Sequence, residues 1–557
     1  MATPEPHSES SLESLPVEVI EQILTGLSLD DIRNVRLVSR EMKAKASGGC
    51  FKTFCFTKEV DLRTQSLREV SALMEPGSVA CELRHLTITG VLYVTMTQEK
   101  IIRLKTKPAD PADIFNNKRD FIGNTMMQRP GRVLASAEDL AHAEAELNVL
   151  ERWQSEAAIE RCSAHDVEAL TELFVRIRKY ATLRRLQSLT LKVTVVRFTK
   201  QRLAPEDGGA WRQIWDTAAH TFLATLQALA SAHLVIECLD AYSGLRVCSL
   251  PGFDIADTLE HIAQGKMWWC FCCVAQHGSS KAFADVHDVD EHASTALDGV
   301  LNSLKSFSLS TSARALPATG SQRVFQADPD SEVRDTDEFS RMRSAINRTE
   351  DAVSTGDLSA MSADPRNTTG VASFLQKMPE LEELTLHEYT IPWHNRRNSV
   401  EKKQSFFHSI AFASPLRCLK RLTFRGLSPN AAELLSFFHA NHDLESVDFR
   451  DIVLHGPWQP IFTHLSSSAN KFTHLHFDVV FEQLADNLTY LYFPGASIRA
   501  GIRSVPAPDG AAAVSIEGRA AVLAGIQYTF SRQWVMGCVQ HSAWREERSR
   551  EYGPSMR

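Results

Sequence analysis

The order of hydrophobic and polar residues follows a helical pattern near the N-terminus and a shorter, strand-like pattern further along the chain. The helical pattern runs from Leu15 to Met42, where thirteen large apolar side chains fall within 28 residues. The first of them recur at helical spacing and predict a helix that closes near Gly26: Val19, Ile20, Ile23, Leu24 and Leu27. Pro16 suits the first turn of this helix, because a backbone N–H at that position has no helical partner in any case.

A second helix is predicted to begin after Ser28. This serine is a typical N-cap, and Asp31 places a carboxylate at the positive end of the helix dipole. Ile32, Val35 and Val38 then share one face. Two helices of this length cannot bury thirteen apolar side chains against each other, and each one left in water forfeits about 1.5–3 kcal/mol of transfer free energy. The sequence therefore predicts that a further surface covers the hairpin.

The same stretch resembles the F-box motif, which begins Leu-Pro-x-Glu and continues through two apolar helical stretches. It matches the motif at Leu15, Pro16, Glu18, Ile23, Leu24, Leu27, Asp31, Val35, Val38, Ser39 and Arg40. One departure is Met42, where the family usually has an aromatic residue. The alternative is an ordinary helical hairpin that caps a larger domain, but so many determinants in register favour the F-box.

Beyond the hairpin, an apolar-x-x-apolar-x-apolar pattern recurs along the chain. It occurs at Leu83/Leu86/Ile88, Leu186/Leu189/Leu191, Leu304/Phe307/Leu309, Leu381/Leu384/Leu386, Leu419/Leu422/Phe424, Leu444/Val447/Phe449 and Phe472/Leu475/Phe477, and more weakly at Ile236/Leu239. The last four full copies are 38, 25 and 28 residues apart. This spacing resembles leucine-rich repeats, in which a short strand is followed by a helix that returns the chain to the next strand.

These repeats are expected to be irregular. The Asn or Cys that usually follows the strand is missing, and Val91, Tyr389, Leu427 and Ile452 stand in its place. An ordinary mixed α/β domain is the alternative interpretation. The expected fold class is therefore α/β, with an N-terminal helical F-box hairpin followed by an irregular leucine-rich-repeat-like solenoid of strand-helix units with disordered inserts.

The expected domain limits follow from these patterns. They are a disordered tail over 1–11, the F-box over 12–50, the repeat-like substrate-binding domain over 51–495 and a partly disordered extension over 496–557. One insert, near 98–165, joins a mildly basic stretch to a charged helix near Ala135 to Arg161; it is expected to be solvated, with docking of an acidic partner as the alternative. The other insert, Thr311 to Gly370, has too few large apolar groups to offset the entropy of ordering it.

Composition and charge narrow the possible functions. Sixty Lys and Arg against 68 Asp and Glu leave a net charge of −8, which argues against nucleic-acid binding by the whole surface. The first residues lack the basic and apolar regions of a signal peptide, and polar residues interrupt the apolar run Phe222 to Leu239. We therefore expect no membrane span and an intracellular location, cytoplasmic and/or nuclear.

One cluster of residues is a candidate for metal chemistry. Cys270, Cys272, Cys273 and His277 lie together, with His287 and His292 following, but the second cysteine pair that a zinc site usually needs is missing. The interleaved aromatic residues favour a buried strand instead. Because the sequence also holds no phosphate loop, nucleophile elbow or kinase signature, we expect no metal site, no cofactor and no catalytic residue.

The resemblance to F-box proteins implies a substrate receptor of a Skp-cullin-F-box ubiquitin ligase. Such a subunit is not an enzyme; it links a Skp-type adaptor, and through it a cullin, to a target protein that the sequence does not identify. The implied adaptor-facing residues are Leu15, Pro16, Glu18, Ile23, Leu24, Leu27, Leu29, Val35, Val38 and Met42. A rival interpretation is an F-box scaffold that binds the adaptor and another partner outside any ligase.

The expected place of substrate binding is the concave face of the repeats. If the strands lie parallel, the residues between their apolar positions point away from the core, because successive strand residues alternate. Thr385, Thr423, Asp448 and His476 are then expected to form one row of substrate-binding side chains.

Overall fold

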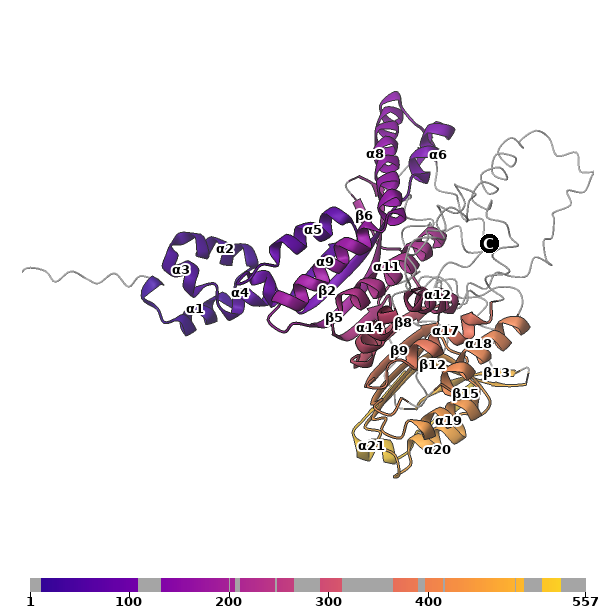
Figure 1. Ribbon diagram of the computed structural model, residues 1–557. Helices are drawn as coiled ribbons and strands as arrows, with labels where there is room; N and C mark the ends of the chain where they lie inside the picture. The colour runs from indigo at the N-terminus through magenta and orange to yellow at the C-terminus, as the bar shows by residue number, and fades with distance from the viewer. Residues whose placement is uncertain are drawn as a thin grey trace, which may run out of the picture.

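The protein is a mixed α/β molecule in which a small helical unit leads into a long, mainly parallel sheet (Figure 1). A computed structural model describes residues 12–108, 132–199, 201–205, 211–245, 248–264, 291–312, 364–388, 396–413, 416–485, 487–494 and 513–531. The expected α/β class, with an N-terminal helical unit and strand-helix units after it, is confirmed.

The N-terminal unit begins with a 3-10 turn, η1 (Leu12–Ser14), followed by α1 (Val17–Leu24), α2 (Leu29–Val38), α3 (Arg40–Lys45) and α4 (Gly49–Thr53). Both predicted helices are present. The Ser28 side chain accepts a hydrogen bond from the backbone N–H of Asp31, and the Asp31 carboxylate accepts one from the N–H of Ser28. The sequence did not predict α3 and α4, which supply Met42, Ala46 and Phe51 to a core shared with Ile20, Leu24 and Ile32. They are part of the further surface that the hairpin needed.

The strands of the main sheet follow the chain from one end of the sheet to the other. Their order is β1 (Thr57–Asp61), β2 (His85–Tyr93), β5 (Leu186–Phe198), β7 (Ile236–Ala241), β8 (Ser306–Thr311), β9 (Glu383–Glu388), β10 (Arg421–Arg425), β11 (Ser446–His455), β12 (His474–Leu484), β13 (Asn487–Tyr492) and β15 (Thr529–Ser531). Neighbours from β1 to β12 pair in parallel. Two short strands lie off this path: β6 (Gln201–Leu203) pairs with β5, and β14 (Ala513–Glu517) pairs with β12.

The register confirms every copy of the apolar pattern, including the weak one. The middle apolar residue of each copy pairs with that of the next, so that Leu384 faces Leu422, Leu422 faces Val447 and Val447 faces Leu475. Ile236 and Leu239 lie in β7 and are buried. The pattern missed β1, because Val60 is the one apolar residue in that strand.

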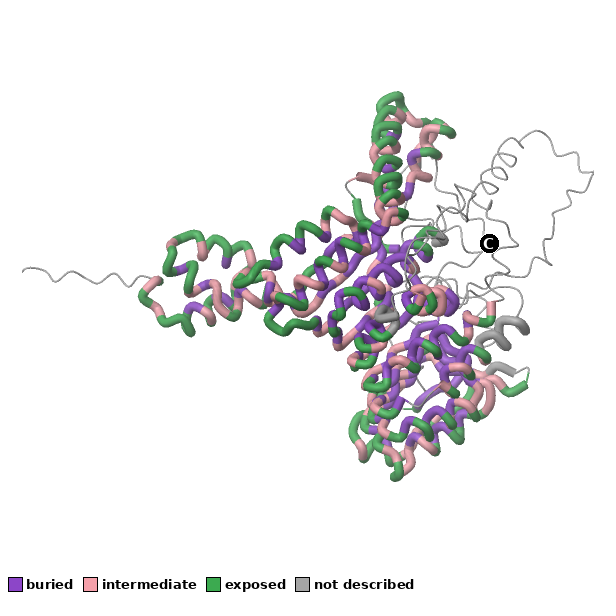
Figure 2. The backbone as a smooth tube through the Cα atoms, viewed as in Figure 1, coloured by how far each residue is buried: buried purple, intermediate pink, exposed green. Residues whose placement is uncertain are grey.

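The helices between the strands cover one face of this sheet. They are α5 (Thr64–Leu73), α9 (His165–Tyr180), α11 (Trp211–Ala232), α12 (Gly252–Ala263), α14 (Glu291–Asn302), α17 (Arg366–Leu375), α18 (Arg396–Ala411), α19 (Ala431–Ala440) and α20 (Gln459–Leu465). The main hydrophobic core lies between them and the apolar side of the strands, and Figure 2 shows it as a continuous buried band. We call the other side of the sheet, expected to be concave, the open face.

Aromatic residues fill this core toward the C-terminal end. Phe424 and Phe449 on neighbouring strands stack with ring centroids 5.8 Å apart, and Phe449 and Phe477 follow at 5.9 Å. Such contacts add about 0.5–1.5 kcal/mol per pair beyond area burial.

The sheet ends in antiparallel strands. The last parallel strand, β12, pairs with β13 along its C-terminal half and with β14 along its N-terminal half, and α21 (Arg519–Leu523) follows β14. Residues 513–531 of the expected extension are therefore part of the sheet or packed next to it. A terminal cap of this kind covers an end that the next repeat would otherwise cover.

Both predicted inserts need correction where the structure describes them. Thr311 ends β8, and Arg366 to Gly370 open α17, whose Asn367 and Gly370 are buried. In the first insert, the expected charged helix is present as α8 (Ala137–Cys162) and is mostly exposed, and the preceding residues add α6 (Met96–Leu104), β3 (Thr106–Pro108) and β4 (Arg132–Leu134), which the sequence did not predict; together they form an arm (Figure 1). The rest of both inserts, including the basic residue Arg119, lies outside the described residues.

Candidate functional site

The N-terminal unit leaves an apolar surface uncovered after its own core is filled. Its exposed large side chains lie on η1, α1 and α2, between 40% and 83% exposed: Leu12, Val17, Val19, Ile23, Leu37 and Val38. Six such side chains on a unit this small are more than scattered surface residues, and exposed apolar residues in such number favour a site of protein interaction.

Eight of the ten residues expected to face an adaptor are at least partly accessible. Pro16, Glu18, Ile23 and Val38 are exposed, and Leu15, Leu27, Leu29 and Val35 are half-buried. Leu24 and Met42 are instead 1% and 2% exposed, because they pack into the core that α3 and α4 complete. These two residues belong to the core of the unit. The expected adaptor-facing set left out three exposed residues, Val17, Val19 and Leu37. They are apolar residues of the same stretch, but they fall between the positions that define the motif.

Polar contacts fix the orientation of this surface. The Glu21 carboxylate on α1 accepts a hydrogen bond from the backbone N–H of Cys50 at 2.7 Å, which ties α1 to the start of α4. A side chain at Gly48 would collide with this carboxylate. On the other side, the Lys45 ammonium donates to the backbone carbonyls of Glu13 and Leu15, which holds the entry to α1.

The four residues expected to bind substrate form the predicted row on the open face. Thr385 pairs with Thr423, Thr423 with Asp448 and Asp448 with His476. All four side chains are half-buried. The row is thus confirmed as geometry, and its use in binding stays a prediction.

Two members of the row already have partners. The Asp448 carboxylate accepts hydrogen bonds from Nε and Nη2 of Arg450, at 2.9 and 2.6 Å. The Nδ1 atom of His476 lies 2.7 Å from the hydroxyl of Ser515 on β14. Burial lowers the pKa of His476, so its imidazole is neutral at pH 7. The row is therefore a set of oriented polar groups and carries no unpaired carboxylate at Asp448.

Comparison with known proteins identifies the N-terminal unit. Residues 12–53 match the family described as the F-box domain. The unit is an F-box domain. The match extends three residues beyond the expected limit of 50, through the end of α4. No curated protein matches the chain.

F-box domains bind Skp-type adaptors. In this protein only a short linker joins the F-box domain to the sheet. Three residues, Phe54 to Phe56, separate α4 from β1. Lys52 on α4 forms an ion pair of 2.9 Å with Glu82, and this contact lowers the pKa of the Glu82 carboxyl. The Arg84 guanidinium lies 3.7 Å from the centre of the Phe56 ring. These contacts fasten the F-box domain to the first strands.

The arm rests on the open face at the C-terminal ends of β2 and β5. Val91, Tyr93 and Val196 point to this face and pack against Leu150 and Trp153 of α8. At the tip side, the Glu146 carboxylate accepts hydrogen bonds from the N–H and hydroxyl of Thr199 at 2.8 and 2.7 Å. Most of the projecting helix is otherwise exposed (Figure 2).

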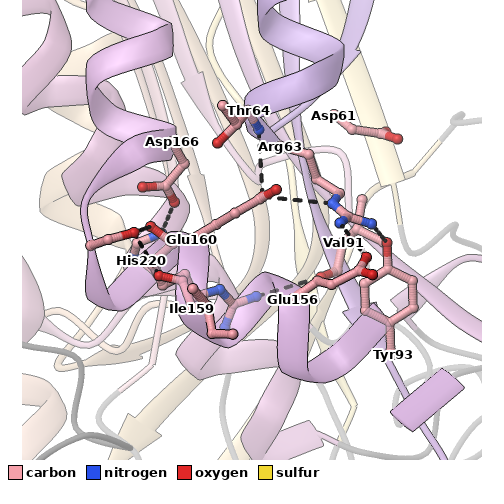
Figure 3. A network of polar contacts seen from close by, with 12 residues as sticks. Asp61, Arg63, Thr64, Val91, Tyr93, Glu156, Ile159, Glu160, Asp166 and His220 are labelled. Atoms are coloured by element: carbon pink, nitrogen blue, oxygen red, sulfur yellow. Dashed lines mark hydrogen bonds and ion pairs between the residues drawn. The ribbon is translucent and has the colours of Figure 1, made fainter. Parts of the chain in front are cut away.

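A polar network fixes the base of the arm (Figure 3). Arg63, two residues after the end of β1, donates to the Tyr93 hydroxyl at 2.9 Å and to Glu156 of α8 at 3.3 Å, and it lies 3.7 Å from Glu160. Beside it, the buried Asp166 carboxylate lies 2.6 Å from Nε2 of His220 (Figure 3). This network joins α8 to the sheet and to the helical layer, and its role is positional.

The expectation of no metal site concerns residues that the structure only partly describes. Among the described residues, no cluster of three or more His, Cys, Asp or Glu side chains could hold a metal ion. The Cys270 to His277 cluster, His287 and His292 lie outside them. Within the described parts of the chain, every helix is too short or too polar to cross a membrane.

Proposed function

We propose that the protein is the substrate-receptor subunit of a Skp-cullin-F-box ubiquitin ligase. The observation that supports this proposal best is the apolar surface of η1, α1 and α2, which the F-box domain leaves uncovered. At about 25 cal/mol per Å² of buried apolar area, covering such side chains is a strong drive for association with an adaptor.

The long sheet supports the second half of the proposal. Its open face carries ordered polar rows over eight successive parallel pairings, so it is large enough to hold a protein target. Catalysis would belong to other subunits. The contribution of this chain would be proximity, because holding a target lysine near a ubiquitin-carrying enzyme makes their encounter effectively intramolecular.

Capture of a purified Skp-type adaptor tests the F-box half. Replacing both Ile23 and Val38 by Glu places charges in the proposed interface and should lower adaptor affinity by about 100-fold or more. Because both side chains are exposed, the melting temperature should stay close to that of the unchanged protein.

A matched control is Phe412→Glu. Phe412 is 63% exposed at the end of α18, in the helical layer, and this variant should bind the adaptor normally. Unchanged adaptor capture by the Ile23→Glu, Val38→Glu protein would contradict the proposal.

The alternative function is an F-box scaffold outside any ligase. It predicts that the adaptor co-purifies with the protein whereas cullin does not. Co-purification of a cullin, and accumulation of a target protein when the chain is removed, are expected for the ligase subunit.

A further inference from the structure

In three of the four ion pairs described below on the open face, the arginine side chain is more exposed to solvent than the carboxylate it pairs with. Arg421 pairs with Glu383, Arg450 with Asp448 at 2.6 Å, and Arg202 with Asp61 at 2.6 Å. In each pair the arginine side chain is more exposed than the carboxylate. The exposed fractions are 60% for Arg421 and 37% for Glu383, 44% for Arg450 and 18% for Asp448, and 58% for Arg202 and 18% for Asp61. A fourth pair, Lys192 with Glu59, has the reverse order at 42% and 53%.

The carboxylates orient the arginines. Asp448 accepts from Nε and Nη2 of Arg450, which leaves the second terminal nitrogen, Nη1, outside this pair. Asp61 holds both terminal nitrogens of Arg202, at 2.7 and 2.6 Å. A guanidinium has five N–H donors, so an arginine that gives two or three of them to one carboxylate still has donors for a second anion.

The depth of each charged group in the open face determines which charge a binding partner contacts first. Each pair is neutral as a whole, and interactions beyond about 8 Å are screened at physiological salt. At contact, however, a partner reaches the more exposed guanidinium first and the less exposed carboxylate second, and the Coulomb energy falls with distance. At these three pairs the open face therefore presents a cation at contact distance, although each pair is neutral.

Two of these arginines bracket the predicted substrate row. Arg421 stands two residues before Thr423 on β10, and Arg450 stands two residues after Asp448 on β11. Beside these arginines the row offers the hydroxyls of Thr385 and Thr423, which are small enough to let a peptide approach the sheet.

We propose that the open face binds an acidic segment of the target protein, with Asp or Glu carboxylates held by Arg421 and Arg450. The inference rests on the proposed function for the existence of a target, and it names the chemistry of the segment that would be read.

Fluorescence anisotropy on the full chain, without an adaptor, tests this proposal. The probes are a fluorescein-labelled Glu-Ser repeat peptide and a Lys-Ser repeat of the same length. The Glu-Ser peptide should bind, more weakly as salt rises, and the Lys-Ser peptide should not. Replacing both Arg421 and Arg450 by Gln, which keeps hydrogen-bond donors for Glu383 and Asp448, should weaken Glu-Ser binding by about tenfold.

Arg185→Gln is the matched control. Arg185 is 48% exposed and pairs with Glu237 at 2.9 Å. It lies just before β5, at the end of the sheet where the parallel strands begin. This variant should bind the Glu-Ser peptide as the unchanged protein does. Equal binding of both peptides, or Glu-Ser binding that survives loss of Arg421 and Arg450, would overturn the proposal.

The two proposals fail separately. Loss of the adaptor interface in the Ile23→Glu, Val38→Glu protein is read by adaptor capture and leaves the sheet intact. An F-box domain that fails to capture the adaptor contradicts the proposed function, whereas a failure of the peptide measurement alone contradicts the acidic-segment proposal.

Discussion

Two glycines set how closely neighbouring helices approach in the middle of the molecule. Gly252 opens α12 and Gly370 lies in α17. A Cβ atom at 370 would lie 1.9 Å from the carbonyl oxygen of Gly252, and one at 252 would lie 2.4 Å from that of Asn367. In each case the obstacle is backbone, which cannot rotate away as a side chain can.

Gly370→Ala is expected to destabilise the protein by about 1–3 kcal/mol, because an inserted methyl forces the two helix backbones apart. Urea denaturation measures the change. The control is Gly299→Ala in α14, where nothing lies within 4 Å of the new Cβ and the gain in helix propensity should stabilise by about 0.5–1 kcal/mol. Equal effects of the two substitutions would show that the glycine contact is unimportant.

The protein is expected to lose stability as pH falls below about 6.5, the ordinary histidine pKa. Burial lowers the pKa of His387, His464 and His476 in the folded state. The unfolded chain therefore binds protons more readily, so the stability these groups contribute is complete above about 6.5 and is lost as pH falls toward their folded pKa. Urea midpoints measured from about pH 7.5 to about pH 5.5 check this.

The carboxyl groups whose pKa is lowered do not explain a change in that window. The pKa of Asp139, for example, is lowered to about 2 by hydrogen bonds from Lys107 and Ser136, so its contribution is lost only in stronger acid. His464→Gln should flatten part of the pH dependence, and a urea midpoint that is constant over the window would contradict the prediction.

At the scale of elements, the segment between β8 and α17 is expected to be dispensable, but not up to the limits read from the sequence. Replacing residues 313–363 by a short Gly-Ser linker should leave the unfolding midpoint nearly unchanged, since loop closure changes by only about 0.6 kcal/mol per doubling of length. Extending the replacement through Gly370 removes the first turn of α17 and should lower the midpoint clearly. Thermal unfolding of both variants measures the difference, and equal midpoints would contradict it.

A column of charged residues precedes the strands and shows what an apolar pattern cannot detect. Lys305, Glu382, Lys420 and Glu445 each donate a backbone N–H to the carbonyl of the preceding member, beginning at Glu237. Their charges alternate along the column. Lys420 and Glu382 form an ion pair of 2.8 Å, which raises the pKa of the lysine and lowers that of the glutamate. Alternation of sign favours the observed strand order over any that brings like charges together.

The elements predicted from the sequence are those whose signal is local. Strands with alternating buried residues and the capped helix α2 carry their signal within a few residues, and both were predicted. The strand β1, the helices α3 and α4 and the cap strand β14 were missed, since contacts with distant residues stabilise them. For the same reason the sequence placed Leu24 and Met42 on the surface, although both lie in the core that α3 and α4 complete.

For the whole molecule, the joint between the F-box domain and the sheet is expected to matter for activity and not for adaptor binding. Under the proposed function, a flexible Gly-Ser insertion after Phe54 should leave adaptor capture unchanged but slow ubiquitin transfer to a bound target, because the effective concentration of the target lysine falls. A reconstituted ubiquitination assay measures the rate. A rate equal to that of the unaltered chain would show that the joint need not be stiff.

A small rotation at the joint between the F-box domain and the sheet displaces the far end of the sheet by a much larger distance. The sheet extends from β1 to β12 over eight strand spacings, which at about 4.8 Å each place its far end about 40 Å from the F-box domain. A rotation of about 10° at the joint would move that far end by about 7 Å, which is about the length of an extended arginine side chain. The ion pair of Lys52 with Glu82 and the packing of Arg84 on Phe56 therefore act at the place where angular error is magnified most.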